Sequence, residues 1–222
     1  MALLEVRDVW FRYGGGSRHV LKGVSLRIDE PSLTLIAGPN GSGKTTLLKV
    51  IAGLLTPEKG DVLVQGVRVT GRADLASRLV GLAFQNPLHQ FSCESVLEEV
   101  RVSMGGLASA EEALRVLRLF GLEGLARRSP FTLSSGEARL LTIASAYSKR
   151  PALLLLDEPL TGLDVNVAEG VSQLINPLRN SGTAVVVTAL SRFLRTYVRM
   201  LMPDKVLILE GGVLKQCVAG RE

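Results

Sequence analysis

A glycine-rich segment at residues 38–46, Gly-Pro-Asn-Gly-Ser-Gly-Lys-Thr-Thr, constrains the fold of this chain more than any other feature. The apolar residues 33–37 before it predict a strand, and the residues after it predict a helix over about 44–55. This is the setting of a G-x-x-x-x-G-K-[ST] phosphate-binding loop, in which backbone N–H groups converge on an anion at a helix N-terminus. A glycine-rich hairpin turn is the alternative, and the helix that follows argues against it.

The side chains of this loop suit a nucleotide phosphate that is bound together with Mg²⁺. Lys44 is expected to reach the β- and γ-phosphates, and the Thr45 hydroxyl is expected to be a ligand of the ion. The loop residues expected to bind the nucleotide are Gly38, Pro39, Asn40, Gly41, Ser42, Gly43, Lys44, Thr45 and Thr46.

A pair of acids after an apolar strand forms a second candidate element. Residues 153–156 are all leucine, and Asp157 and Glu158 follow at once. A continuous apolar run predicts a strand buried on both faces, and ligands bind where such parallel strands end. Asp157 is therefore expected to hold Mg²⁺, and Glu158 to polarise a water for attack on the γ-phosphate. A simple pair of helix N-terminal acids is the alternative, and the phosphate loop favours the catalytic interpretation.

Composition indicates a globular protein. A chain of 222 residues can form one or two domains, and no apolar run approaches the roughly 18 residues that a membrane-spanning helix needs. The first residues lack a signal-peptide pattern, and Cys93 and Cys217 lie far apart without metal-ligand spacing. We therefore expect a soluble cytoplasmic protein in which both cysteines are reduced packing residues.

The net charge of +5 does not by itself indicate a nucleic-acid partner. Basic residues are spread along the whole chain, and Arg192, Arg195 and Arg199 form a series at i, i+3 and i+7. That series is either the solvated face of a late helix or a binding stripe, and the solvated face is the simpler interpretation. We expect no nucleic-acid partner.

The order of predicted elements indicates a sheet-based core that is interrupted by a helical block. Strands are predicted at residues 3–9, 20–28, 33–37, 61–69 (a hairpin turning at Gly66), 79–84, 152–157, 183–188, 206–209 and 213–217. Helices are predicted at about 44–55, 73–78, 94–104, 109–121 and 192–200. One further helix is predicted to begin near residue 136, and another, after the strand at 152–157, to end near residue 178. We expect one domain, in which 86–150 is an inserted helical subdomain and 1–85 and 151–222 form an α/β core with an antiparallel β part.

A Ser-Ser-Gly turn opens the last helix of the helical block. Ser134 and Glu137 have the spacing of a capping box, in which each side chain accepts a hydrogen bond from the other residue's backbone N–H. The same turn also suits an anion, because it lies at the N-terminus of a helix. The residues alone leave both interpretations open.

With these motifs in place, the chain resembles the nucleotide-binding domain of ATP-binding cassette (ABC) proteins over nearly its full length. The corresponding motifs are the Walker A loop at 38–46, Gln85 after a strand, the signature at 133–137, the Walker B strand at 153–159 and the D-loop at 161–164. Tyr13 occupies the place of the aromatic side chain that stacks on adenine, and packing within a strand would explain it equally well.

The resemblance implies a P-loop NTPase fold with a RecA-like mixed sheet, an N-terminal antiparallel β subdomain and an inserted α-helical subdomain. It implies ATP and Mg²⁺ as ligands, with each ATP held between the Walker A loop of one ABC ATPase subunit and the signature of a second. It also implies an integral membrane transport subunit as a partner, and a peripheral location on the cytosolic face of the cell membrane. By this resemblance the catalytic residues are Glu158, Lys44 and Gln85, the metal ligands are Thr45, Gln85 and Asp157, and further nucleotide contacts come from Tyr13, Ser134, Ser135, Gly136, Glu137 and Asp164.

A narrower resemblance is to importers of the energy-coupling-factor type and their cobalt and nickel relatives. It rests on Phe-Gln-Asn-Pro at 84–87, Gln-Phe at 90–91 and Ser-Val-Leu-Glu-Glu-Val at 95–100. Those importers use paired ATPases, often two different chains. The acidic residues that are common after the proline in that group are Leu88 and His89 here.

The chain departs from the ABC pattern at the signature and after one strand. In the signature, Ser135 replaces glycine and Glu137 replaces glutamine, and neither change abolishes an anion site if Glu137 is turned into its own capping box. Ala189 occupies the place of the histidine that contacts the γ-phosphate in the family. Either Ser191 or Arg192 substitutes for that histidine, or the site binds ATP and cleaves it slowly. We expect slow cleavage.

The leading hypothesis is therefore the ATPase subunit of an ABC transporter, and of an importer in particular. ATP would favour a closed head-to-tail dimer, because the γ-phosphate contact exists only before hydrolysis. A non-transport ABC ATPase is one alternative, and a hydrolysis-poor structural partner in a heterodimeric complex is another.

Overall fold

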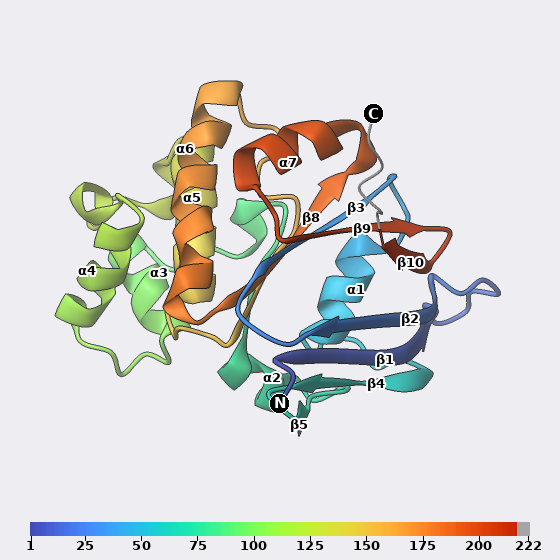
Figure 1. Ribbon diagram of the computed structural model, residues 1–222. Coiled ribbons are helices and arrows are strands. Elements are labelled where there is room, and N and C mark those ends of the chain that lie inside the picture. The colour runs from blue at the N-terminus through green and yellow to red at the C-terminus, as the bar shows by residue number, and fades with distance from the viewer. Residues whose placement is uncertain (217–222) are drawn as a thin grey trace.

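The larger of two sheets forms the centre of the computed structural model, which describes residues 1–216 (Figure 1). It has 6 strands in the order β10-β9-β3-β8-β7-β6. The strands from β9 to β6 run parallel, and β10 adds an antiparallel edge. The strands are β3 (Leu33–Gly38), β6 (Val80–Ala83), β7 (Leu153–Leu156), β8 (Ala184–Leu190), β9 (Lys205–Glu210) and β10 (Val213–Gln216).

The smaller sheet is antiparallel and has 4 strands in the order β2-β1-β4-β5. These are β1 (Leu4–Phe11), β2 (Leu21–Ile28), β4 (Lys59–Val64) and β5 (Val67–Arg68). Helix α1 (Lys44–Ile51) lies between the two sheets, where Leu47 and Ile51 share one buried apolar cluster with residues of both (Figure 1). The helix that follows the phosphate loop is therefore fixed by packing on two sides.

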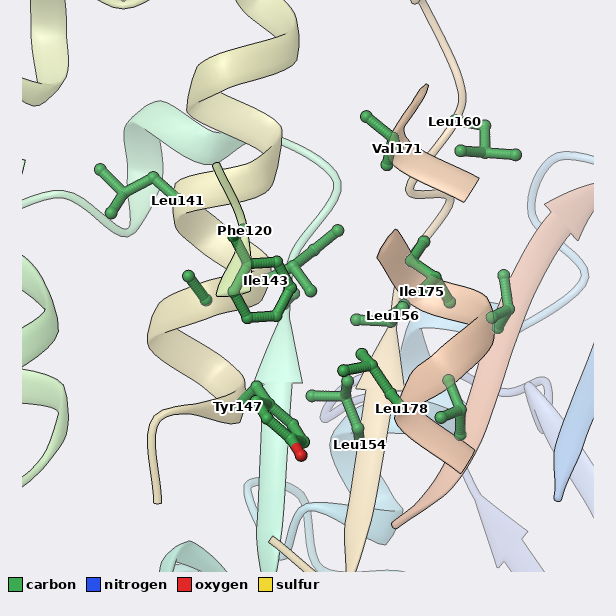
Figure 2. Close-up of a cluster of buried hydrophobic side chains, with 14 of the residues drawn as sticks. Phe120, Leu141, Ile143, Tyr147, Leu154, Leu156, Leu160, Val171, Ile175 and Leu178 are labelled. Atoms are coloured by element: carbon green, nitrogen blue, oxygen red, sulfur yellow. The ribbon is translucent and has the colours of Figure 1, made fainter. Parts of the chain in front are cut away.

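The opposite face of the larger sheet is covered by α5 (Ser135–Tyr147), α6 (Val165–Ile175) and α7 (Leu194–Leu201). Leu154 and Leu156 of β7 pack into this second buried cluster, with Ile143 and Ile175 among its helical members (Figure 2). The alternate residues, Leu153 and Leu155, belong to the cluster around α1. Strand β7 is thus buried on both faces, which confirms the expectation from its run of leucines.

Between β6 and β7 the described chain is helical. This segment contains α3 (Val96–Ser103), α4 (Ala110–Leu119) and α5, with short 3₁₀ turns between them. Helix α2 (Ala73–Leu79) lies before β6. The capping box considered at Ser134 is present, with Glu137 as its partner, and Ser109 forms a second one with Glu112 at the start of α4. These caps satisfy backbone N–H groups that a helix start would otherwise leave free, which explains where α4 and α5 begin.

Among the element boundaries that differ from the sequence-based expectation are the ends of α1 and β8. Helix α1 ends at Ile51 rather than near residue 55, because Gly53 takes a φ of +69° and the N–H of Leu54 turns back to the Lys49 carbonyl at 2.9 Å. Strand β8 continues past residue 188 to Leu190, because it remains paired with the end of β3. The longer β8 matters for the site, since it carries the position at which the family histidine was sought.

Cys93 is half-buried and free, and Cys217 lies outside the described residues. Within residues 1–216, none of the helices has the length and apolar character needed to cross a bilayer.

Candidate active site

The phosphate loop, residues 39–43, leaves the C-terminal end of β3 and leads into α1. Gly41 and Gly43 have φ angles of +72° and +103°, in the region that glycine alone adopts without strain. A side chain at Gly38 would collide with the Leu209 carbonyl oxygen. The Ser42 hydroxyl is buried and has no hydrogen-bond partner among the described residues. The loop therefore has the backbone of an anion cradle, and a buried polar group that a ligand can satisfy.

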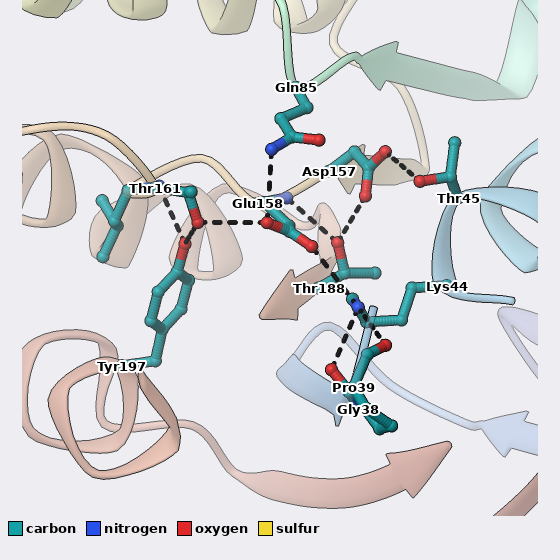
Figure 3. Close-up of polar contacts among 11 residues, drawn as sticks. Gly38, Pro39, Lys44, Thr45, Gln85, Asp157, Glu158, Thr161, Thr188 and Tyr197 are labelled. Atoms are coloured by element: carbon teal, nitrogen blue, oxygen red, sulfur yellow. Dashed lines mark hydrogen bonds and ion pairs between the residues drawn. The ribbon is translucent and has the colours of Figure 1, made fainter. Parts of the chain in front are cut away.

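Lys44 lies at the centre of this end of the sheet, and its side chain is 5% exposed. Its Nζ donates to the carbonyl oxygens of Gly38 and Pro39, both at 3.0 Å, and lies 3.4 Å from Glu158 Oε1 (Figure 3). A buried ammonium group needs such partners, because desolvation disfavours an unpaired charge. Lys44 therefore links the phosphate loop to the acid that follows β7.

Asp157 and Thr45 form an oxygen pair suited to a hard cation. The Thr45 hydroxyl donates to Asp157 Oδ2 at 2.6 Å, and Thr188 donates to Asp157 Oδ1, also at 2.6 Å (Figure 3). A carboxylate beside a hydroxyl is the donor set with which P-loop proteins hold Mg²⁺. The residues present therefore fit a Mg²⁺ ion that arrives with a nucleotide.

Glu158 is held in a buried and constrained position. Its backbone has a φ of +47°, and its N–H donates to the Thr188 hydroxyl at 3.0 Å. Its carboxylate accepts hydrogen bonds from Gln85 at 3.4 Å and from Thr161 at 3.2 Å, besides its contact with Lys44. A non-glycine residue at positive φ costs energy and is typical of functional sites. The arrangement presents a carboxylate, which can act as a base, beside the phosphate loop.

The position of Gln85 depends on Arg139, a residue that the sequence analysis did not single out. The Arg139 guanidinium donates to the carbonyl oxygens of Gln85 at 2.5 Å and of Phe84 at 3.3 Å. Burial lowers the pKa of Arg139, because desolvation disfavours its charge. This arginine ties α5 to the segment that follows β6, and so connects the helical block to the site.

Tyr13 lies beside the phosphate loop, which is where an adenine-stacking residue is expected. Its hydroxyl is 3.0 Å from Thr46 Oγ1, and its ring packs edge-on against Phe11 at 5.0 Å between ring centroids. Nearly half of Tyr13 is exposed to solvent. A cavity of about 310 Å³ also adjoins the loop, lined by Arg18, His19, Val20, Pro39, Asn40, Gly41, Ser42, Gly211 and Gly212.

Comparison with protein-family models matches residues 21–161, well over half of the chain, to the family described as ABC transporter. This chain belongs to the ABC transporter family. An ABC transporter ATP-binding protein of Pyrococcus horikoshii, so named provisionally, is 41% identical over 220 residues, which cover 96% of this chain and 82% of the relative. The energy-coupling factor transporter ATP-binding protein EcfA of Methanocaldococcus jannaschii is 32% identical in an alignment of 228 positions, which covers 97% of this chain and 79% of that protein.

Solved structures agree with this assignment. CbiO1 of Clostridium perfringens, described as part of the ABC transporter complex CbiONQ, has a TM-score of 0.81 at 26% identity, over 96% of this chain and 87% of that one. A dimeric ATP-binding cassette in a post-hydrolysis state with ADP and phosphate has the same TM-score at 24% identity, which supports the fold. The present chain is thus an ATP-binding subunit of an ATPase family, and it has the mixed α/β fold of ABC cassettes.

In this chain, the signature (residues 133–137) lies at the start of α5. Within the described residues, it has no hydrogen bond to the phosphate loop. The Ser134 N–H donates to Glu137 at 2.7 Å, and this bond lowers the pKa of the Glu137 carboxyl. Glu137 therefore points back into its own capping box. A Cβ at Gly136 would lie 2.5 Å from a side-chain methyl of Val167 in α6, so a larger residue here would force Val167 to move.

The D-loop aspartate, Asp164, also bonds within its own helix start. Asp164 is the N-cap of α6, and its carboxylate accepts a hydrogen bond from the Val167 N–H at 3.0 Å. Within a single chain, the structure thus brings Lys44, Thr45, Asp157 and Glu158 together, with Gln85 in contact, whereas the signature and Asp164 serve as helix caps elsewhere.

Ala189 lies inside β8 rather than after it, where the sequence analysis expected it. It pairs in register with Ala37 and is fully buried in the cluster beneath the helices. The proposed substitutes are exposed: Ser191 and Arg192 belong to the next turn, and the Arg192 guanidinium lies over the Phe193 ring at 4.8 Å. Neither side chain has a hydrogen bond to the site within the described residues.

Proposed function

We propose that this cassette is an ATPase subunit of an importer of the energy-coupling-factor type. It would act with a second ABC ATPase and an integral membrane subunit, as a peripheral protein on the cytosolic face of the cell membrane. The observation that carries the ATPase part is the meeting of Lys44, Asp157 and Glu158 at the end of the parallel strands. The importer part is supported by the EcfA relative, and by a Bacillus subtilis protein named for HMP/thiamine import, 37% identical over 188 residues that are 34% of its length.

In this proposal the phosphate loop and Lys44 bind the β- and γ-phosphates, and Tyr13 stacks on adenine. Thr45, Asp157 and Gln85 would hold Mg²⁺, which neutralises charge on the phosphates when bound. Residues 1–85 and 151–222 would serve as the nucleotide-binding core, and 86–150 as the subdomain that carries the signature.

The remaining site residues act on the water and on the second subunit. Glu158 is the general base for the attacking water, as its buried carboxylate beside Lys44 suggests. Ser134, Ser135 and Gly136, with Asp164, would complete the ATP site of the partner ATPase. This division is supported by the absence of any described hydrogen bond between these residues and the chain's own phosphate loop.

We further propose that this chain's own site cleaves ATP slowly. Ala189 offers only a methyl group, which can neither donate a hydrogen bond to the γ-phosphate nor orient a water. Its burial within β8 and the engagement of Arg192 with Phe193 both support this proposal. Turnover in a mixed dimer would then occur mainly at the partner's ATP site.

The first test concerns the phosphate loop. Lys44→Ala should weaken MgATP binding at least tenfold, because it removes a charge-assisted contact that contributes about 1.5–3 kcal/mol. Isothermal titration calorimetry measures the dissociation constant. Lys59→Ala, which removes an equal charge from the exposed end of β4, is the matched control and should bind MgATP as the wild type does. Equal affinity in Lys44→Ala and the control would show that the loop is not the nucleotide site.

The second test concerns association. MgATP should convert the cassette from a monomer or weak dimer into a dimer, and Glu158→Gln should hold that dimer longer, because the γ-phosphate contact persists. Light scattering with and without MgATP measures the change in mass. A tight dimer that is indifferent to the nucleotide would contradict the closing mechanism.

A further inference from the structure

Tyr197 of α7 contacts the loop that follows β7, and the function proposed above assigns no role to this side chain. Its ring is 2% exposed, and its hydroxyl meets two groups of the loop after β7 (Figure 3). The Leu160 N–H donates to the Tyr197 hydroxyl at 3.0 Å, and Thr161 Oγ1 lies 3.3 Å from it. Thr161 in turn donates to Glu158 Oε2 at 3.2 Å. A chain of contacts thus runs from α7 to the proposed base.

The chemistry of these groups fixes the direction of the hydrogen bonds. An ionised carboxylate only accepts, so the single proton of Thr161 points to Glu158. Tyr197 must then donate its own proton to Thr161, and it accepts from the backbone N–H of Leu160. Burial raises the pKa of Tyr197 to about 12, so the hydroxyl keeps this proton at neutral pH.

Leu160 packs into the apolar cluster, whereas the next residues of the loop border a cavity. This cavity has a volume of about 190 Å³, with Thr161, Gly162, Val165, Phe193 and Tyr197 among its lining residues. Where a loop makes fewer apolar contacts, polar contacts contribute more to its local stability. Tyr197 supplies such contacts to two successive residues, and the second of them touches the Glu158 carboxylate.

We propose that Tyr197 is a positioning residue for ATP hydrolysis, which orients the Glu158 carboxylate through Thr161 and anchors the D-loop through Leu160. The proposal rests on the proposed role of Glu158 as the base. Helix α7 would then contribute to catalysis through Tyr197. This contribution matters here because Ala189 cannot help to orient the attacking water. Since the alignment of a base affects the transition state more than ground-state binding, the rate should respond rather than the affinity.

The test begins with Tyr197→Phe, which keeps the buried ring and removes only the hydroxyl. We expect the single-turnover rate of ATP cleavage to fall about three- to tenfold, with the MgATP dissociation constant unchanged within about twofold. In the nucleotide-free cassette, amide hydrogen exchange at Leu160 should become about tenfold faster, because its N–H loses the acceptor. This second readout does not depend on activity.

A double-mutant cycle with Thr161→Val tests the route through Thr161. If Tyr197 acts through Thr161, the double variant should be no slower than Thr161→Val alone, since the link is already broken. Tyr147→Phe is the matched control, because Tyr147 is also buried and its hydroxyl bonds to the Ser181 hydroxyl at 2.8 Å, away from the site. It should leave the cleavage rate and the exchange of Leu160 unchanged.

Four results would overturn the proposal. An unchanged rate in Tyr197→Phe, with faster exchange at Leu160, would reduce Tyr197 to a structural anchor. Additive losses in the double variant, or an equal loss in Tyr147→Phe, would also refute action through Thr161. If the wild type cleaves ATP no faster than Glu158→Gln, the role of Glu158 itself is wrong and this proposal falls with it. If instead the rate falls in Glu158→Gln but not in Tyr197→Phe, the role of Glu158 stands and only the role of Tyr197 is refuted.

Discussion

Glu158→Gln should lower the single-turnover rate of ATP cleavage about 100-fold or more while MgATP affinity stays nearly constant, because general-base catalysis contributes about 10²–10⁴-fold. Glutamine has the size of glutamate but cannot accept the proton of the attacking water. Its single amide oxygen can accept a hydrogen bond either from Lys44 or from Gln85 and Thr161, and its unchanged size should preserve the local packing. Quench-flow measurement of labelled phosphate from prebound ATP gives the rate.

The matched control is Glu169→Gln, which makes the same change on the exposed face of α6, where Glu169 is paired with Arg199 at 3.7 Å. It should change neither the rate nor the affinity. An equal rate in Glu158→Gln and the wild type would mean that another group activates the water, despite the burial of this carboxylate beside the phosphate loop.

Ala189→His is expected to act in the opposite direction, with a gain in single-turnover rate on the order of 100-fold and little change in affinity. An imidazole can donate to the γ-phosphate and orient the water, which a methyl group cannot do. Because Ala189 is fully buried within β8, the larger side chain should also cost about 1–3 kcal/mol of folding free energy. Rates should therefore be compared below the measured unfolding temperature of each variant.

The control for this experiment is Ala189→Leu, which adds a side chain of similar volume without a hydrogen-bond donor. It should lose comparable stability and gain no activity. A rate gain in both variants would indicate that loosening of β8, rather than the imidazole, limits hydrolysis. No gain in a folded Ala189→His would show that the missing histidine does not limit this site.

The phosphate loop could be predicted from the sequence because its requirements are local. Gly41 and Gly43 adopt the positive φ angles that the motif needs, and Lys44 follows at the first position of α1. The strand of leucines before Asp157 likewise follows from a simple rule, since a strand buried on both faces has no polar alternation. Both elements can therefore be recognised from a sequence pattern only a few residues long.

The supporting contacts could not be predicted, because they depend on register between distant segments. Thr188 holds both Asp157 and the Glu158 N–H only because β8 lies beside β7 in one parallel register. Tyr197 and Arg139 resemble ordinary members of helices α7 and α5 until tertiary packing brings them to the site. The continuation of β8 to Leu190 was missed for the same reason, since its pairing with the end of β3 is not a local property.

The most direct test of the account compares ATP binding with ATP cleavage in the same wild-type cassette. Labelled ATP is prebound with Mg²⁺, and its conversion to ADP is followed in the cassette alone and after addition of the ATPase that copurifies with the tagged cassette from membranes of its native host. We expect tight binding with slow conversion by the cassette alone, and fast turnover only in the mixed complex, where Ser134, Ser135 and Gly136 would complete the partner's site. Rapid cleavage by the cassette alone, at the rate of the mixed complex, would contradict the unequal pair and show that another group does the work expected of the family histidine.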